Sequence, residues 1–471
     1  MTTLTSETTV SPPSTPGALS WLMGDMQQFG DEPLEVLSTY PAKYGPIIHI
    51  NSRFAQRLGP IRYFLATHPD YLQQMLQSNN RNYIKEQRLM GILESVGDKM
   101  LFTTDGQEWL ERRRKMQPAF HRKEIDNFGA IMTEETEKML DRWREAADRQ
   151  EMLDIASEMT RLTMLVIGRT MFSLDFSQDA DIFDAAYSVF TRLVTERLST
   201  FLPAPLFIPT EKNRQLKGAM KTIRSEIKQM IQDRLAEPLE SDRPTDLMDM
   251  LLDSYAAQED PLLTYDELIS ELNGIIFAGH ETTANVLTWV FYLLSEHPEA
   301  AQKLDEELAT VLQGRSPTME DLPHLPYTHM VLDETMRLYP SAWISSRQAV
   351  EEDRFDNYLI PAGAKIFLNI WGMHRHPDYW EKPDSFFPEH FTPERVAARH
   401  KFAFIPFGAG PRKCIGERFA KTEAALVLAT VFPHVSLRIK EGFVPVPEAD
   451  FTLQAKGGMP MHIEMREAVP A

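Results

Sequence analysis

The sequence predicts a mainly α-helical protein with small β-sheets. Apolar residues recur at helical spacing over residues 125–147, 152–172, 180–198 and 213–235. The expected extended runs are short: residues 47–50, 63–66 and 461–465. No repeat or linker divides the chain, so we expect one domain over residues 26–471. Residues 1–25 are rich in Thr, Ser and Pro, which predicts a disordered tail.

Composition narrows the class of protein. The chain of 471 residues has a net charge of −19, which argues against a nucleic-acid partner because phosphate binding requires clustered Lys and Arg. One cysteine allows neither an internal disulfide nor a multi-cysteine metal site. The start of the chain has no apolar run, so we expect neither a signal peptide nor a membrane anchor. A cytoplasmic enzyme is the resulting expectation.

Residues 265–295 predict one unusually long helix of about 45 Å. It is apolar on nearly all sides, which is typical of a central, buried helix. A polar stretch from Gly279 through His280, Glu281 and Thr282 to Thr283 interrupts it. The stretch is either a buried cluster that satisfies its own hydrogen bonds or a functional site.

The single cysteine lies in a loop with two prolines and three glycines. The loop spans residues 404–416 and contains Phe407, Gly408, Arg412, Cys414 and Gly416. A helix-like run follows over residues 417–431. A helix start favours a thiolate over a thiol. Such a thiolate is an iron ligand or a nucleophile, and a nucleophile needs a nearby base. The loop has no histidine, whereas its aromatic ring, glycines and arginine suit haem binding.

These residues fit F-x-x-G-x-R-x-C-x-G, and the chain thereby resembles the cytochrome P-450 family. Residues 278–283 likewise resemble the family's oxygen-activation motif. The resemblance implies a cytochrome P-450 fold in which haem b lies between the long central helix and the cysteine loop with its following helix. It implies that Cys414 is the iron ligand and that Phe407, Gly408 and Gly416 adjoin the haem. Glu281 and Thr282 would serve oxygen activation, with Gly279 leaving space for oxygen.

Other motifs extend the resemblance. Trp109 and Arg113 form W-x-x-x-R, and with Arg347 and Arg412 they are implied to bind the haem propionates. Glu334 and Arg337 form E-x-x-R, which could be a surface ion pair by spacing alone. The resemblance makes it a structural pair with a third member. We favour His390 for that place over Arg395, which fits a rival register.

The resemblance implies a haem-thiolate monooxygenase that inserts one atom of O2 into a C–H bond or C=C of a lipophilic substrate such as a fatty acid or terpenoid. We recognise no appended reductase domain, so electrons are expected from a separate ferredoxin or flavodoxin and its reductase. A basic patch would dock this partner, comprising Arg112, Arg114, Lys115, Lys413, Arg418 and Lys421. A peroxide-using enzyme and a non-catalytic haem sensor are the alternatives, and the intact Glu281 and Thr282 argue against both.

Substrate contacts are also expected from the resemblance. They are Ile92, Leu93, Phe277, Ala278, Ala342, Trp343, Ile344 and Leu453. The apolar loop at residues 198–209 is expected to cap the entrance, to touch a membrane surface, or simply to pack between helices.

Overall fold

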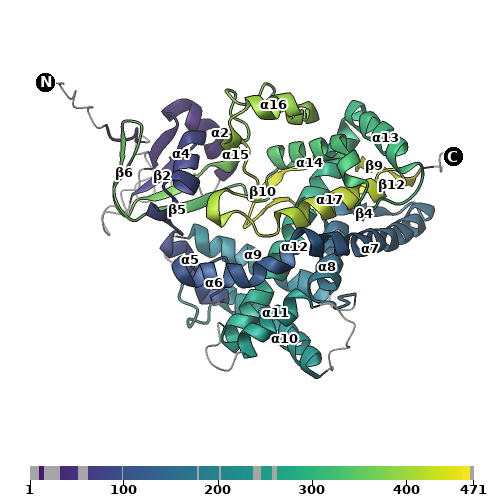
Figure 1. The fold of residues 1–471 in the computed structure, drawn as a ribbon, viewed down its shortest axis with the longest axis horizontal. Coiled ribbons are helices and arrows are strands. Elements are labelled where there is room, and N and C mark those ends of the chain that lie inside the picture. The colour runs from purple at the N-terminus through teal and green to yellow at the C-terminus, as the bar shows by residue number, and fades with distance from the viewer. Residues whose placement is uncertain are drawn as a thin grey trace. The chain divides into compact units, whose positions relative to one another are not determined.

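The computed structural model describes residues 10–14, 32–50, 62–97, 99–177, 180–200, 203–236, 245–256 and 263–466. Its contacts divide into two compact units. Unit 1 comprises residues 1–90, 342–385 and 390–414, and unit 2 comprises residues 91–341, 386–389 and 415–471. The described elements are mostly helices with small sheets, as the sequence predicts (Figure 1). The single domain over residues 26–471 stays a prediction.

Unit 1 is built on a five-stranded sheet. Its order is β1 (Ile47–Ile50), β2 (Tyr63–Ala66), β8 (Lys365–Leu368), β5 (Ser345–Ala349) and β3 (Tyr83–Ile84). β2 and β8 run parallel and the other neighbours run antiparallel. The strands predicted at residues 47–50 and 63–66 are confirmed. Apolar side chains of this sheet, among them Phe64 and Ile366, form the core of the unit.

Shorter elements complete unit 1. Its helices are α2 (Pro33–Tyr44), α4 (Pro69–Gln73), α15 (Ile370–Met373) and α16 (Pro393–Ala398), and β6 (Asp353–Phe355) pairs with β7 (Tyr358–Ile360). Most of the tail predicted to be disordered lies outside the described residues. Within its described part, Val10 forms a bridge to Tyr358 and Ser14 to His49.

Unit 2 is a helical assembly. Its helices are α6 (Gly106–Met116), α7 (Arg122–Asp148), α8 (Ile155–Met171), α9 (Ala180–Ser199), α10 (Glu211–Ala236), α11 (Leu247–Ala256), α12 (Tyr265–Glu296), α13 (Pro298–Leu312), α14 (Pro326–Leu338) and α17 (Glu417–Val431). α5 (Gln87–Gly97) begins in unit 1 and ends in unit 2. The predicted helices match these bounds closely. Residues 152–154 differ, because they form β4 (Met152–Asp154) and pair with a later strand.

Two small sheets accompany these helices. β4, β12 (Pro460–Met465) and β9 (Val435–Ile439) form a three-stranded antiparallel sheet, which confirms the predicted strand at residues 461–465. β10 (Pro447–Ala449) and β11 (Leu453–Ala455) form a hairpin. None of the helices in the described ranges is long and apolar enough to cross a membrane.

The predicted central helix is α12, which packs against α8, α10, α14 and α17 (Figure 1). The Thr264 hydroxyl and the Glu267 carboxylate cap its first turn reciprocally. Gly279 lies where α12 meets α8, and a Cβ added there would stand 2.5 Å from Cδ1 of Ile167. The expected role of Gly279, leaving space for oxygen, stays a prediction. Its missing side chain lets α8 approach.

A buried arginine ties α6 to the first turns of α12. The Arg112 guanidinium is 2.7 Å from Glu271, 2.5 Å from Glu267 and 2.8 Å from Glu108, and the residue is 2% exposed. Glu271 also accepts a hydrogen bond from the backbone N–H of Leu101 at 2.9 Å. Arg112 is thus unable to belong to a docking surface. That part of the predicted basic patch is wrong, because sequence spacing did not reveal the three carboxylates that hold the side chain inside.

Candidate active site

The cysteine loop in unit 1 is closed by its own backbone. The Cys414 N–H donates to the Phe407 carbonyl at 2.9 Å, and the Gly408 N–H donates to Ile405 at 2.9 Å. Fully buried His374 accepts the Ile405 N–H at Nε2, 3.0 Å away, a support that the sequence analysis missed. Cys414 itself is exposed and does not belong to the hydrophobic core.

The two central glycines of the loop have different functions. Both have positive φ, +69° at Gly408 and +68° at Gly410, a region that L-residues rarely adopt. A Cβ on Gly410 would lie 1.6 Å from the Leu76 carbonyl oxygen, so this glycine lets the loop meet the neighbouring helical turn. A Cβ on Gly408 would have nothing within 4 Å among the described residues. Gly408 therefore leaves open space beside the thiol-bearing loop, as a flat cofactor requires.

The helix after the cysteine begins where it was predicted. Gly416 occupies the N-cap of α17, which runs from Glu417 to Val431. Cys414 thus stands just ahead of the positive end of a helix of 15 residues. The N–H groups at the start of a helix stabilise negative charge nearby, so the position favours a thiolate.

In unit 2, the polar stretch of α12 has one open face. Ala278 is exposed, and Ile275, Thr282 and Asn285, which lie above and below it on the same face, are partly exposed. The opposite faces of the helix are buried. The Thr282 hydroxyl donates to the Ala278 carbonyl at 2.8 Å, which leaves its oxygen able to accept a hydrogen bond from the open side.

Glu281 belongs to a short chain of polar side chains. The Thr452 hydroxyl donates to its carboxylate, and the Asn285 amide donates to Thr452 at 3.1 Å. Burial raises the pKa of Glu281 to about 7, with smaller contributions from the charges of Asp450 and Asp184, against the lowering effect of Thr452. The carboxyl group can therefore both hold and release a proton near neutral pH.

His280, the other titratable residue of the stretch, is fully enclosed. Its Nδ1 lies 2.7 Å from the Ile276 carbonyl, and its ring contacts Tyr187. Burial lowers the pKa of His280 to about 4, so the ring is neutral at physiological pH. The polar stretch thus contains both a satisfied buried residue and a titrating one, and the two interpretations left open by the sequence apply to different residues.

The side chains predicted to bind propionates occupy three places. Trp109 and Arg113 share one face of α6, as their spacing predicts, with the guanidinium 5.7 Å from the indole centroid. Arg347 lies in β5, is largely buried and donates to the Ser346 carbonyl at 2.7 Å. Arg412 ends a helical turn, Gly410–Arg412, of the cysteine loop. Their roles toward a cofactor stay predictions.

Glu334 and Arg337 form a fully buried bidentate pair on α14. Arg337 Nε is 2.8 Å and Nη2 2.7 Å from the two carboxylate oxygens, and the Phe387 N–H adds a third bond to Glu334 at 2.8 Å. The surface-pair interpretation is therefore wrong. His390 is 2% exposed and packs edge-on against Trp380, whereas the Arg395 side chain is 41% exposed and pairs with Glu381. This difference favours His390 over Arg395, and the third place stays a prediction.

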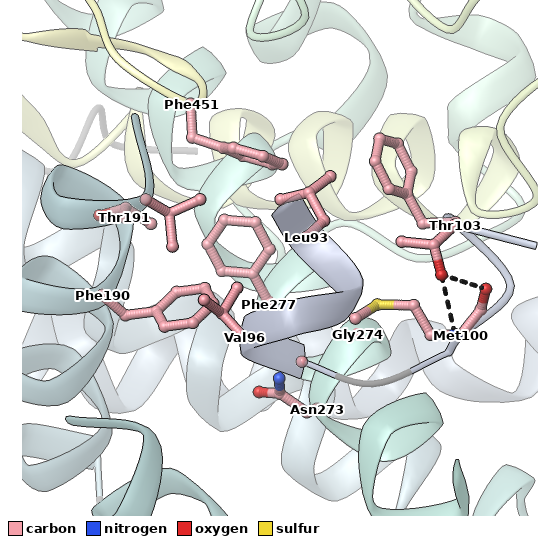
Figure 2. Close-up of a pocket in the computed structure, with 13 residues that line it drawn as sticks. Leu93, Val96, Met100, Thr103, Phe190, Thr191, Asn273, Gly274, Phe277 and Phe451 are labelled. Carbon is pink, nitrogen blue, oxygen red and sulfur yellow. Dashed lines mark hydrogen bonds between the residues drawn. The ribbon is translucent and has the colours of Figure 1, made fainter. Parts of the chain in front are cut away.

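Unit 2 contains a small apolar cavity that is partly open to solvent (Figure 2), in which the centre of a water-sized sphere has about 40 Å³ of space. Thirteen residues line it: Leu93, Val96, Gly97, Met100, Phe102, Thr103, Phe190, Thr191, Val194, Asn273, Gly274, Phe277 and Phe451. The Phe277 and Phe451 rings meet edge to face, with centroids 5.4 Å apart. None of these lining residues carries a charge.

The cavity agrees with only part of the predicted substrate contacts. Leu93 and Phe277 line it. Ile92, Ala278 and Leu453 lie in the same unit but outside this lining, and Leu453 is fully buried. Ala342, Trp343 and Ile344 belong to unit 1. Most of the lining was missed, because it comes from segments far apart in the sequence that carry no motif.

The loop at residues 198–209 is described except for residues 201 and 202. Phe207 is 80% exposed, and Ile208 is also exposed. Their exposure is compatible with a contact surface, and the predicted role in capping the substrate entrance stays a prediction.

Comparisons identify the family. The cytochrome P-450 family model matches residues 12–460. The chain is 33% identical to cyclooctat-9-en-7-ol 5-monooxygenase of Streptomyces melanosporofaciens, over 92% of this chain and 89% of that protein. It is 31% identical to cyclooctatin synthase of the same organism, over 93% of each. A crystal structure of a cytochrome P-450 haem domain superimposes with a TM-score of 0.84 at 22% identity, covering 98% of this chain and 99% of that one.

The chain therefore belongs to the cytochrome P-450 family and is a cytochrome P-450 monooxygenase. The family holds haem b through a cysteine thiolate. The residues present fit that cofactor: an exposed thiol on a rigid loop, open space at Gly408, and an open strip on a buried helix.

The two loop glycines generate a stability prediction. Gly410→Ala should lower the free energy of unfolding by about 3 kcal/mol or more, because the new methyl group meets a backbone carbonyl and φ is positive. Gly408→Ala is the matched control, with strain but no clash, and should cost about 1–2 kcal/mol. Urea unfolding of both variants measures the difference. Equal losses would contradict the packing role of Gly410.

Proposed function

We propose that this enzyme inserts one oxygen atom of O2 into a C–H bond or C=C of a terpenoid. The observation that carries the proposal is the cavity lining, which combines four phenylalanine rings with aliphatic side chains and no charge. A fatty acid would place a carboxylate in or near such a cavity. None of the thirteen lining residues offers a cation to a carboxylate, whereas the same lining stabilises a hydrocarbon skeleton.

The relatives support this substrate class. Cyclooctat-9-en-7-ol 5-monooxygenase and cyclooctatin synthase are bacterial enzymes that oxygenate terpenoids, and both match this chain over most of their length. The first of these is named for an alcohol on which it acts. A lipophilic cyclic substrate for this chain agrees with both names.

We assign the iron ligand to Cys414, because it is the only cysteine of the chain. Phe407, Gly408 and Gly416 would adjoin the haem on the thiolate side, and Trp109, Arg113, Arg347 and Arg412 would hold its propionates. Glu334 and Arg337, with His390, would form the structural cluster that supports the haem-binding core. When bound, the haem supplies the electron transfer and oxygen activation that no protein side chain provides.

Glu281 and Thr282 would manage protons. The Glu281 carboxyl group, which accepts a hydrogen bond from the Thr452 hydroxyl, would take up a proton from water and release it toward the open face of α12. The Thr282 hydroxyl donates its hydrogen bond to the Ala278 carbonyl. Its Oγ would therefore accept a hydrogen bond from a protonated group and orient that group. This proton delivery supports an O2-dependent monooxygenase over a peroxide-using enzyme or a haem sensor.

Electrons would come from a separate ferredoxin or flavodoxin with its reductase. Arg114 and Lys115 on α6 and Lys413 in the cysteine loop are exposed cations suited to an acidic partner. Arg418 already pairs with Asp126 at 3.4 Å, and Lys421 with Asp333 at 3.0 Å. Of these residues, Arg114 and Lys115 are therefore the stronger candidates for docking.

The substrate proposal is tested by competitive turnover with a surrogate ferredoxin and ferredoxin reductase. Cyclic terpenes and saturated fatty acids are supplied together under isotopically labelled O2. We expect terpene products that contain one labelled oxygen atom, and little oxygenated fatty acid. Preferential oxygenation of the fatty acids would overturn the substrate class, and products formed only with added peroxide would overturn the monooxygenase mechanism.

Glu281 should give the reaction a pH dependence. Its carboxyl group is protonated below about pH 7, so proton delivery and coupled product formation should fall as the pH rises through 7. Glu281→Gln should lower the rate about 100-fold and flatten this profile. Thr452→Val removes a hydrogen bond that lowers the pKa of Glu281, so its profile should shift to higher pH. A Gln variant that keeps the wild-type inflection would exclude Glu281 as the titrating group.

A further inference from the structure

Asn273 differs from the other polar residues that line the cavity. Thr191 donates its hydroxyl to the Tyr187 carbonyl at 2.9 Å, and Thr103 exchanges hydrogen bonds with the backbone of Met100. The hydroxyl protons of both threonines are thus already donated within the protein. Asn273 Oδ1 accepts the Tyr187 hydroxyl at 2.7 Å, whereas its Nδ2 has no hydrogen-bond acceptor among the described residues.

Tyr187 fixes the orientation of this amide. The tyrosine is buried, and burial raises its pKa well above 10, so the hydroxyl keeps its proton and acts as donor. Its ring is held between Phe183, Phe277 and His280. Because Oδ1 is occupied by this donor, the two N–H groups of Asn273 remain for another partner.

The amide also stands where the surroundings change from apolar to polar. Phe277 lies one turn beyond Asn273 on α12 and contacts Phe451, so the aromatic part of the cavity extends away from the amide (Figure 2). Asn273, with Val96 and Phe190, also borders a second, smaller hollow that includes Arg224 and Ser270. A molecule with a hydrocarbon body and one oxygen matches this gradient.

We infer that Asn273 donates a hydrogen bond to a hydroxyl or carbonyl oxygen of the substrate, whose hydrocarbon skeleton packs against the aromatic side chains of the cavity. The inference rests on the proposed terpenoid function and narrows it to terpenoids that already carry one oxygen. Tyr187 is a positioning residue for the amide. The reaction that supplies the substrate must then install that oxygen, either by water capture at the end of a cyclisation or by an earlier hydroxylation.

The test compares matched ligands on the haem-loaded protein by equilibrium dialysis, which needs no turnover. The probes are cedrene with cedrol and kaurene with kaurenol, each pair a hydrocarbon and its alcohol. The ratio of dissociation constants within a pair is measured for wild type, Asn273→Leu, Tyr187→Phe and Thr191→Val. Comparing ratios between proteins cancels the difference in hydration between the two ligands.

We expect Asn273→Leu to reduce the preference for the alcohol about 3- to 10-fold relative to wild type, with hydrocarbon binding retained. Tyr187→Phe should reduce it less, because the amide remains but loses its orientation. Thr191→Val, whose hydroxyl bonds its own helix, should leave the ratio within about twofold. Retained hydrocarbon binding shows that each variant is folded.

The outcomes separate two failures. If both members of a pair bind and the ratio is unchanged in Asn273→Leu and Tyr187→Phe, the inference about Asn273 is wrong and the terpenoid function stands. If no terpene binds to wild type and none is oxygenated, the proposed function fails and the inference fails with it.

Discussion

The backbone geometry of the cysteine loop is the constraint on which the rest of the account depends. Two backbone contacts fix the position of Cys414. The Cys414 N–H donates a hydrogen bond to the Phe407 carbonyl, and Gly410 packs closely against the Leu76 carbonyl. Left-handed φ values at Gly408 and Gly410 make both possible. The packing of unit 1 thereby holds Cys414 at a fixed place in the chain just ahead of α17.

α12 combines several functions through its periodicity. Asn273, Phe277 and Glu281 follow each other at four-residue intervals, so they share one side of the helix over about 12 Å. The first two line the apolar cavity, and the third holds a titrating carboxyl group. Two residues before Asn273, Glu271 pairs with Arg112 and accepts a hydrogen bond from the backbone of Leu101, which lies between Met100 and Phe102 of the cavity lining. A buried ion cluster thereby stabilises the segment that shapes the substrate space.

The sequence predicted what is local and missed what depends on tertiary packing. The long helix and the cysteine loop with α17 were predicted because periodicity, glycine spacing and motif order are written in consecutive residues. Arg112 was misplaced because its partners Glu267 and Glu271 lie more than 150 positions away. The packing of Gly279 depends on Ile167 of another helix. The orientation of the Asn273 amide depends on a hydrogen bond from Tyr187, which also lies on another helix. No sequence motif predicts these contacts, because each one forms between helices that are distant in the sequence and adjacent in the structure.

The most direct test of the central claim is the absorption spectrum of the reduced, carbon-monoxide-bound protein, measured for wild type and Cys414→Ser. Thiolate ligation by Cys414 predicts a strongly red-shifted Soret band that is lost in the variant. A wild-type band at the position typical of histidine-ligated haem, or a red-shifted band that survives in Cys414→Ser, would contradict the assignment of Cys414 as the iron ligand.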